Sequence, residues 1–232
     1  GRNVTVNNSH FANNIESIYL MGVDYSSIRN CTFQVPATPA PWPGSVACGI
    51  GSDGSAALTI KDNVFSTFGG GLSNDNYGLV IGNSGDNFAS LAQRNSFTGI
   101  NIGTQLQKVN TMLQVKCHDF NQYQRGMAVT SGQLANQGNC LTSTGPAGST
   151  WDDLMACFGS DRQIFKDASV PPFVYSAHAN QIPTCVSQGV MVAWCQSQGS
   201  EQSCADPQDP CGCVPKPCCE LEAIAQLETI RQ

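Results

Sequence analysis

A short pattern of apolar and polar positions recurs through roughly the first 130 residues of the chain. It consists of an apolar residue, four intervening residues and a phenylalanine, and its copies end at Phe11, Phe33, Phe65, Phe97 and Phe120. A second run with apolar outer members follows each copy: Ile18–Leu20, Cys48–Ile50, Leu79–Ile81, Ile100–Ile102 and Met127–Val129. A period of two is typical of a strand with one buried face. Each copy therefore predicts two short strands.

The spacing of the phenylalanines indicates a repeat with insertions. Successive phenylalanines are 22, 32, 32 and 23 residues apart, which a basal unit of about 22 residues explains. The segments lack the apolar spacing of i, i+3 and i+4 that helical repeats require. Units of this length with short strands and polar corners predict a solenoid in which each unit is one coil.

These five corners, with the strands "GLVIG" and "GINIG" that follow two of them, resemble the right-handed parallel β-helix proteins over roughly residues 3–131. The resemblance implies a ladder of stacked asparagines at a coil corner, which Asn63 and Asn95 fit. We therefore predict an all-β protein: a right-handed parallel β-helix of about five coils, followed by a small Cys-rich α+β region. The insertions place loops at residues 34–47 and 66–77.

Composition divides the chain near residue 135. Of the 18 asparagines, 17 precede residue 140, whereas nine of the 12 cysteines lie from Cys140 onward. We predict a solenoid over residues 1–135, a small capping region over 136–199, and a Pro/Cys-rich linker with the start of a helix over 200–232. Within the capping region we expect a short helix from Trp151 to Phe158 and two strands near "PPFVYSAH" and "GVMVAWC".

Charge and cysteine content restrict the partners and the compartment. Residues 1–139 carry seven Lys/Arg and seven Asp/Glu, and residues 140–232 carry four and ten, so the net charge of −6 belongs to the second region. This balance disfavours nucleic acid as a partner. Apolar runs are too short for a membrane span. Twelve cysteines indicate an oxidising compartment, so we expect an extracellular or cell-surface protein.

The predicted coils lack the catalytic motifs of the β-helix enzymes. The β-helix family includes polysaccharide lyases and polygalacturonases, but the polygalacturonase motifs N-T-D, D-D, G-H-G and R-I-K do not occur in the coils. The cysteine spacing of the tail does not suit a zinc site. We therefore expect no catalytic residue, no metal and no cofactor.

The two insertions form the first candidate binding surface. Stacked loops from adjacent coils would make one wall, in which Trp42 is held by four prolines and offers a ring to a sugar. The alternative is that Trp42 folds back as a lid on the coil. Hydrogen-bonding partners for a sugar come from the second loop and its end: Asn74, Asp75, Asn76 and Tyr77.

A second candidate lies four positions before each phenylalanine. Stacking places Arg29 and Lys61 on adjacent coils, about 4.8 Å apart. The pair would suit an acidic sugar. The alternative is an ordinary solvated face.

The nine cysteines from Cys140 onward are an odd number, so complete pairing requires a bond to the solenoid. We expect a disulfide between Cys31 and Cys48, which would close the Pro-rich loop at its base, and one between Cys117 and Cys140. The alternative is that Cys48 is a buried thiol.

These features predict a structural or adhesive surface module. A β-helix followed by a Cys-rich region resembles the large secreted surface proteins of Bacteroidota that use type IX secretion. The first coil has bare strand edges, so we expect another copy of the chain, stacked end to end, or the rest of a longer parent chain to cover it. The alternative function is a carbohydrate-binding or polysaccharide-cleaving β-helix that contacts surface glycans through the loop wall.

Overall fold

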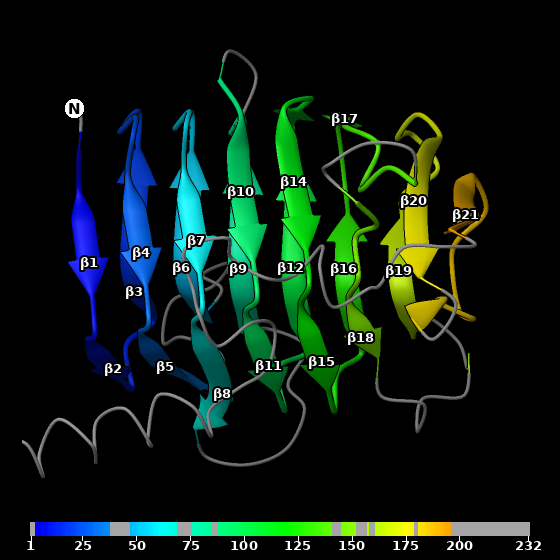
Figure 1. Ribbon diagram of the computed structural model, residues 1–232. Coiled ribbons are helices and arrows are strands. Elements are labelled where there is room, and N and C mark those ends of the chain that lie inside the picture. Colours follow the sequence, from blue (N-terminus) through cyan, green and yellow to red (C-terminus); the bar gives the residue numbers. More distant parts are fainter. Residues whose placement is uncertain are drawn as a thin grey trace, which may run out of the picture.

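The structure is a computed structural model that describes residues 3–37, 47–68, 76–84, 88–140, 145–151, 157, 161–178 and 181–195. Its described part is built from parallel strands, which Figure 1 shows side by side in rows. The expected helix over 220–232 and the linker over 200–219 lie outside these residues.

Three sheets run along the molecule. The first consists of β1 (Thr5–Asn7), β4 (Ser27–Arg29), β7 (Thr59–Lys61), β10 (Ser90–Gln93) and β14 (Leu113–Lys116). The second consists of β2 (His10–Ala12), β5 (Thr32–Pro36), β8 (Val64–Phe68), β11 (Ser96–Thr98), β15 (Asp119–Asn121) and β18 (Thr150–Trp151). The third consists of β3 (Glu16–Met21), β6 (Ala47–Asp53), β9 (Asn76–Gly82), β12 (Ile102–Gln107), β16 (Arg125–Val129) and β19 (Arg162–Lys166).

The chain visits the three sheets in turn, so the predicted parallel β-helix is confirmed. Five coils, from β1–β3 to β14–β16, are followed by β18 and β19 of a sixth. Two further parallel pairs are β13 (Val109–Asn110) with β17 (Gln133–Leu134), and β20 (Phe173–His178) with β21 (Val190–Cys195). The last pair confirms the two strands expected there. Trp151 lies in β18 instead of opening a helix, and most of the remaining segment to Phe158 lies outside the described residues.

The repeated phenylalanines of the second sheet form one continuous stack in the interior of the β-helix. Their ring centroids are 4.8–5.1 Å apart from Phe11 to Phe120, and the indole of Trp151 extends the stack at 4.8 Å from Phe120. Glycines of the third sheet face these rings. A Cβ at Gly49 would lie 2.6 Å from Phe65, and one at Gly103 would lie 2.5 Å from Phe120. The glycines therefore provide the space in which the rings stack.

The predicted asparagine ladder is present and buried. Asn63 Oδ1 accepts a hydrogen bond from the Cys31 N–H, and Asn63 Nδ2 donates to Asn95 Oδ1 at 3.0 Å. The next position is His118, whose Nδ1 accepts the Asn95 N–H at 3.2 Å, and Ser149 Oγ follows. Each rung thus satisfies a backbone donor in the neighbouring coil, which a buried corner requires.

The residue before each rung has a left-handed backbone. Its φ lies between 52° and 58° in four coils, at Asn30, Asp62, Arg94 and Cys117, and is 51° at Asn8. Asparagine and aspartate tolerate this conformation better than most residues do. The corner geometry therefore explains the polar residue at this position in the first three coils.

The strand register corrects two of the predicted second runs. Ile18 aligns with Ile50, Leu79, Thr104 and Met127 through the third sheet. The run predicted at Cys48–Ile50 is therefore two residues early, and the one at Ile100–Ile102 is four residues early. Ile100 and Ile102 are both buried, although the strand begins only at Ile102. A buried turn can thus resemble a strand in its apolar pattern.

Beyond residue 135, non-repeating contacts close the last coil. Gln137 Oε1 accepts the Val115 N–H at 2.7 Å, and its Nε2 donates to the Leu113 carbonyl at 3.1 Å. Gln163 Oε1 accepts the Cys185 N–H at 2.9 Å. The Gln137 side chain satisfies backbone groups of β14 that a sixth strand of its sheet would otherwise bond. The Gln163 side chain instead holds the segment around Cys185 beside β19, whose backbone bonds that segment directly.

Candidate functional sites

The two predicted loops begin at the same corner of adjacent coils. One insertion connects β5 with β6 and the other connects β8 with β9, and both strand pairs are adjacent in their sheets. Trp42, Asn74 and Asp75 fall within 38–46 and 69–75, outside the described residues. Glycan binding through this wall therefore stays a prediction.

The two candidates at the end of the second loop belong to strand β9. Asn76 is fully buried, and its Nδ2 donates to Thr67 Oγ1 at 3.0 Å while its Oδ1 accepts the Asn101 N–H at 2.7 Å. Its amide therefore anchors the base of the loop. Tyr77 is half-buried between its strand partners Cys48 and Ile102.

Arg29 and Lys61 are direct partners on adjacent strands. Arg29 is exposed and donates from Nε to Ser27 Oγ at 2.9 Å. Lys61 is only 6% exposed, and its Nζ lies 3.9 Å from Asp62 Oδ2. The same Asp62 carboxylate accepts two hydrogen bonds from Arg94, at 2.6 and 3.0 Å. The predicted neighbours are thus adjacent, but only Arg29 is open to solvent.

Cys31 and Cys48 are both free and buried, so the bond expected between them does not form. Cys31 stands in the ladder position of its corner, and its thiol donates to the Arg29 carbonyl at 3.1 Å. Cys48 lies in the third sheet opposite Glu16. Burial, with a smaller contribution from the Glu16 charge, raises the pKa of Cys48 to about 12. The alternative interpretation, a buried thiol at Cys48, is correct.

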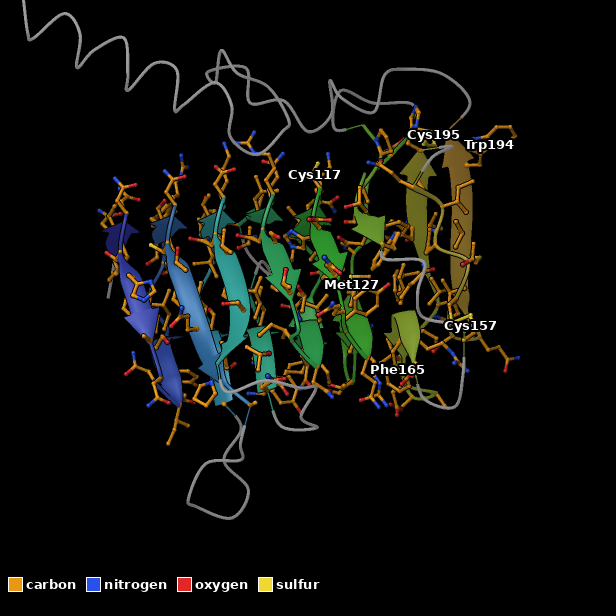
Figure 2. All side chains as sticks on the ribbon, turned by 90° about the horizontal axis from the view of Figure 1, so that it is seen from below. Cys117, Met127, Cys157, Phe165, Trp194 and Cys195 are labelled. Atoms are coloured by element: carbon orange, nitrogen blue, oxygen red, sulfur yellow. A yellow bond between two sulfur atoms is a disulfide. The ribbon has the colours of Figure 1, made fainter. Side chains whose placement is uncertain are left out.

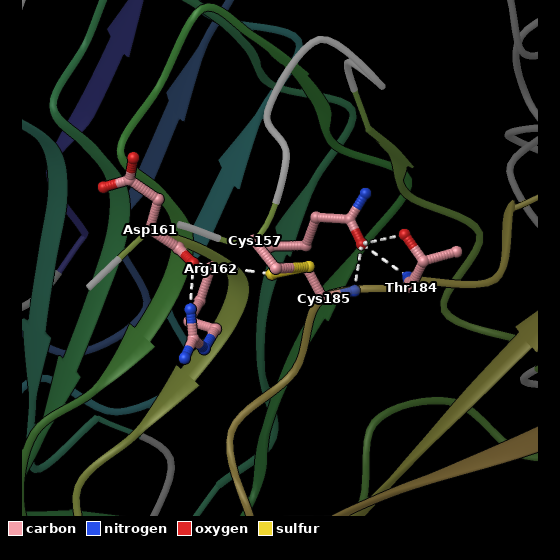
Figure 3. Close-up of a disulfide and its surroundings, with 6 residues drawn as sticks. Cys157, Asp161, Arg162, Thr184 and Cys185 are labelled. Atoms are coloured by element: carbon pink, nitrogen blue, oxygen red, sulfur yellow. Dashed lines mark hydrogen bonds between the residues drawn. A yellow bond between two sulfur atoms is a disulfide. The ribbon is translucent and has the colours of Figure 1, made fainter. Parts of the chain in front are cut away.

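Two disulfides join segments at the end of the stack farthest from β1. Cys140 bonds to Cys195, with Cα atoms 5.0 Å apart, and Cys157 bonds to Cys185, with Cα atoms 5.6 Å apart (Figures 2 and 3). Cys117 is also disulfide-bonded, but its expected partner Cys140 is engaged elsewhere. Disulfides of this kind indicate an oxidising environment, extracellular or periplasmic.

No family model matches the chain, and neither does any curated protein or solved structure. The candidate sites are therefore judged by their chemistry alone.

The described residues contain no group of three or more His, Cys, Asp and Glu placed to hold a metal ion. Within the same part of the chain, no helix has the length and hydropathy to cross a bilayer. His118 makes edge contacts with the stacked rings of Phe97 and Phe120, and burial lowers its pKa to about 3. It is therefore a neutral rung of the ladder at ordinary pH.

One feature was not predicted from the sequence. A surface depression of about 470 Å³ lies beside β19, and its lining includes Arg162, Lys166 and the turn at 187–189. Arg162 and Lys166 lie more than twenty residues before this turn, which is not part of the repeat. Only the fold of the residues beyond 135, here called the cap, brings them together.

Proposed function

We propose that this protein is an extracellular structural or adhesive surface module. Within the proposal, it belongs to a larger secreted protein of the kind that Bacteroidota export by type IX secretion, and its β-helix serves as a rigid spacer. The stacked rings, the buried ladder and the disulfides support this role, because each favours persistence in an oxidising environment.

The observation that carries the proposal is the open face of the first coil. Val6, Phe11 and Ile18 pack against the core but are only partly buried, whereas their counterparts in the next coil, Ile28 and Phe33 among them, are fully buried. Among the described rings, Phe11 stacks on Phe33 alone. A face of partly exposed core residues beside free strand edges is a surface for another coil.

The backbone of β1 shows how such a coil would pair. Asn8 donates its N–H to the Arg29 carbonyl, and Ser27 donates to the Val4 carbonyl. Alternate residues of a parallel strand direct their backbone groups to opposite sides. Thr5 and Asn7 therefore direct theirs toward the open edge, where another copy or the rest of a parent chain would add a strand.

Sedimentation velocity over a range of concentrations tests this proposal. We expect the chain to associate through its first coil, and Val6→Asp to abolish association because it buries a charge in the contact. Thr5→Pro should do the same without altering the core, because it removes only an outward N–H. The control is Met21→Asp, a highly exposed position on the outer face of β3. A chain that remains monomeric at every concentration would contradict the proposal.

A further inference from the structure

The depression beside β19 has a mixed lining that suits one class of ligand. Arg162 and Lys166 supply positive charge, Ser187 supplies a hydroxyl, and Val170, Pro172 and Val186 supply apolar surface. Among the described residues, its lining includes no aspartate or glutamate. In a chain with a net charge of −6, two cations in one depression are a local concentration of positive potential.

The carboxylate that precedes Arg162 in sequence is directed away from it, whereas the Lys166 charge is one of the causes, after the hydrogen bonds from Ser169, that lower the pKa of the neighbouring Asp167. Figure 3 shows the Asp161 carboxylate directed away from the Arg162 guanidinium, which donates instead to the Asp161 backbone carbonyl at 2.6 Å. The Asp167 carboxylate accepts hydrogen bonds from the N–H and the hydroxyl of Ser169, at 2.9 and 2.7 Å. The guanidinium therefore retains donors for a ligand.

A third cation stands next to Arg162. Arg125 is its direct partner in β16, and the Arg125 guanidinium carbon lies 3.9 Å from the centroid of the Phe165 ring. Like charges on adjacent strands repel each other. Arg125 thus adds positive charge on the strand next to β19.

Lys166 is held in place by the fold. Its side chain is 8% exposed, and its ammonium donates to the carbonyls of Asp167 at 2.9 Å and Val170 at 2.5 Å. Two carbonyl acceptors leave one of the three ammonium donors for another partner. Gly189 has φ of 86°, and a Cβ there would lie 2.6 Å from Lys166 Cε. Glycine at this turn thus makes room for the lysine.

We propose that this depression binds an acidic oligosaccharide, with its carboxylates or sulfates on Arg162 and Lys166. The apolar side chains contact the C–H faces of the sugar rings. Arg162 and Lys166 are four residues apart on one strand, so their Cα atoms are about 13 Å apart, which favours a ligand with several anionic groups over a single sugar acid. This inference rests on the proposed adhesive function and names the partner class for it.

Isothermal titration calorimetry of the whole chain at low salt tests the site. The probes are a tetramer of galacturonic acid, a heparin-derived tetrasaccharide, a neutral tetrasaccharide and sodium sulfate. We expect the acidic oligosaccharides to bind and the neutral one not to bind, with affinity that falls as NaCl is added. The two acidic probes distinguish a carboxylate ligand from a sulfate ligand.

Three variants locate the binding. Arg162→Gln should weaken it on the order of tenfold or more, because one charge-assisted hydrogen bond is lost. Ser187→Asp should weaken it further by placing a carboxylate in the lining. The control Lys108→Gln removes one positive charge from an exposed residue that belongs to no candidate binding site and should change nothing.

Four results would overturn the inference: no binding, equal binding of the neutral probe, equal loss in Lys108→Gln, or binding of sulfate but neither oligosaccharide, which means an adventitious ion only. Loss of binding in Trp42→Ala with full binding in Arg162→Gln would assign the ligand to the loop wall instead. None of these outcomes affects association through the first coil, so sedimentation judges the proposed function separately.

Discussion

The two ends of the β-helix stabilise their outermost coils in different ways. At the first coil, Phe11 stacks on one ring and the edges of β1, β2 and β3 carry no further strand in the described structure. At the other end, Trp151 lies against the Phe120 ring and makes an edge contact with Tyr175 in β20. The first coil therefore keeps the contacts of the repeat, whereas at the other end contacts with residues outside the repeat take their place.

The difference shows what ending a solenoid requires. Inside the stack, each coil satisfies the backbone of the next, and the same contact recurs at every level. At the closing end, the Gln137 side chain bonds the edge of β14, and the backbone around Cys185 bonds the edge of β19. Stability is therefore distributed over many equivalent contacts in the coils and concentrated on a few residues in the cap.

The largest change in the free energy of unfolding is expected from truncating a ring of the stack, and equivalent rings near the two ends can be compared. Phe120→Ala should lower the free energy of unfolding by about 3–5 kcal/mol, because this fully buried ring is stacked on both sides. Phe11→Ala should cost less than half as much, because its ring is partly exposed. Urea titration monitored by circular dichroism measures both variants. Equal losses would mean that the first coil is covered in solution.

Removing a cap side chain should have the next largest effect. Gln137→Ala leaves the buried Val115 N–H without its side-chain acceptor, at about 1–3 kcal/mol, and removes one of the two side-chain donors to the Leu113 carbonyl. The matched control is Gln133→Ala in β17, which is exposed and should change stability by less than about 0.5 kcal/mol. If the two variants unfold at the same urea concentration, the cap does not depend on this side chain.

Acid should act on the histidine rung of the ladder. His118 has a folded pKa of about 3 against 6.5 for the ordinary side chain. Because the unfolded chain binds the extra proton between these values, His118 makes stability fall as the pH drops from 6.5 toward 3, at about 1.4 kcal/mol per unit.

His118→Asn should reduce the loss of stability between pH 7 and pH 5 by about 2 kcal/mol, because it removes the titrating group and keeps the ladder position polar. Urea titrations at both pH values measure this difference. The Asp and Glu residues contribute equally in both proteins, so an unchanged pH dependence in the variant would show that His118 does not control it.

Much of the fold can be predicted from the sequence because the repeat places equivalent residues at regular intervals. Phe33, Phe65 and Phe97 occupy equivalent positions, so their spacing predicts the coils, and the resemblance to parallel β-helix proteins adds the asparagine ladder. Asn30 and Asp62, one position before the ladder, are residue types that tolerate a left-handed backbone, so they are a further sequence signal of the corner.

Features outside the repeat were harder to predict. The pairing of Cys140 with Cys195 depends on where β21 docks, and the chain has no second copy of that strand from which its position could be inferred. The same holds for the depression, which joins Arg162 to a turn more than twenty residues later. Cys31 looked like a bonding partner because it lies near Cys48 in sequence, yet the two belong to different parts of the coil.

The bond between Cys140 and Cys195 also affects how the molecule responds to mechanical force. It spans a sequence separation of 55 residues, and the bond between Cys157 and Cys185, with a separation of 28, lies inside that span. While the outer bond is intact, tension applied on both of its sides bypasses β18, β19, β20 and β21. Reduction of the outer bond alone would lengthen the chain between those points by roughly 90 Å, because the inner disulfide keeps its own segment short, and reduction of both bonds would raise the gain to roughly 190 Å.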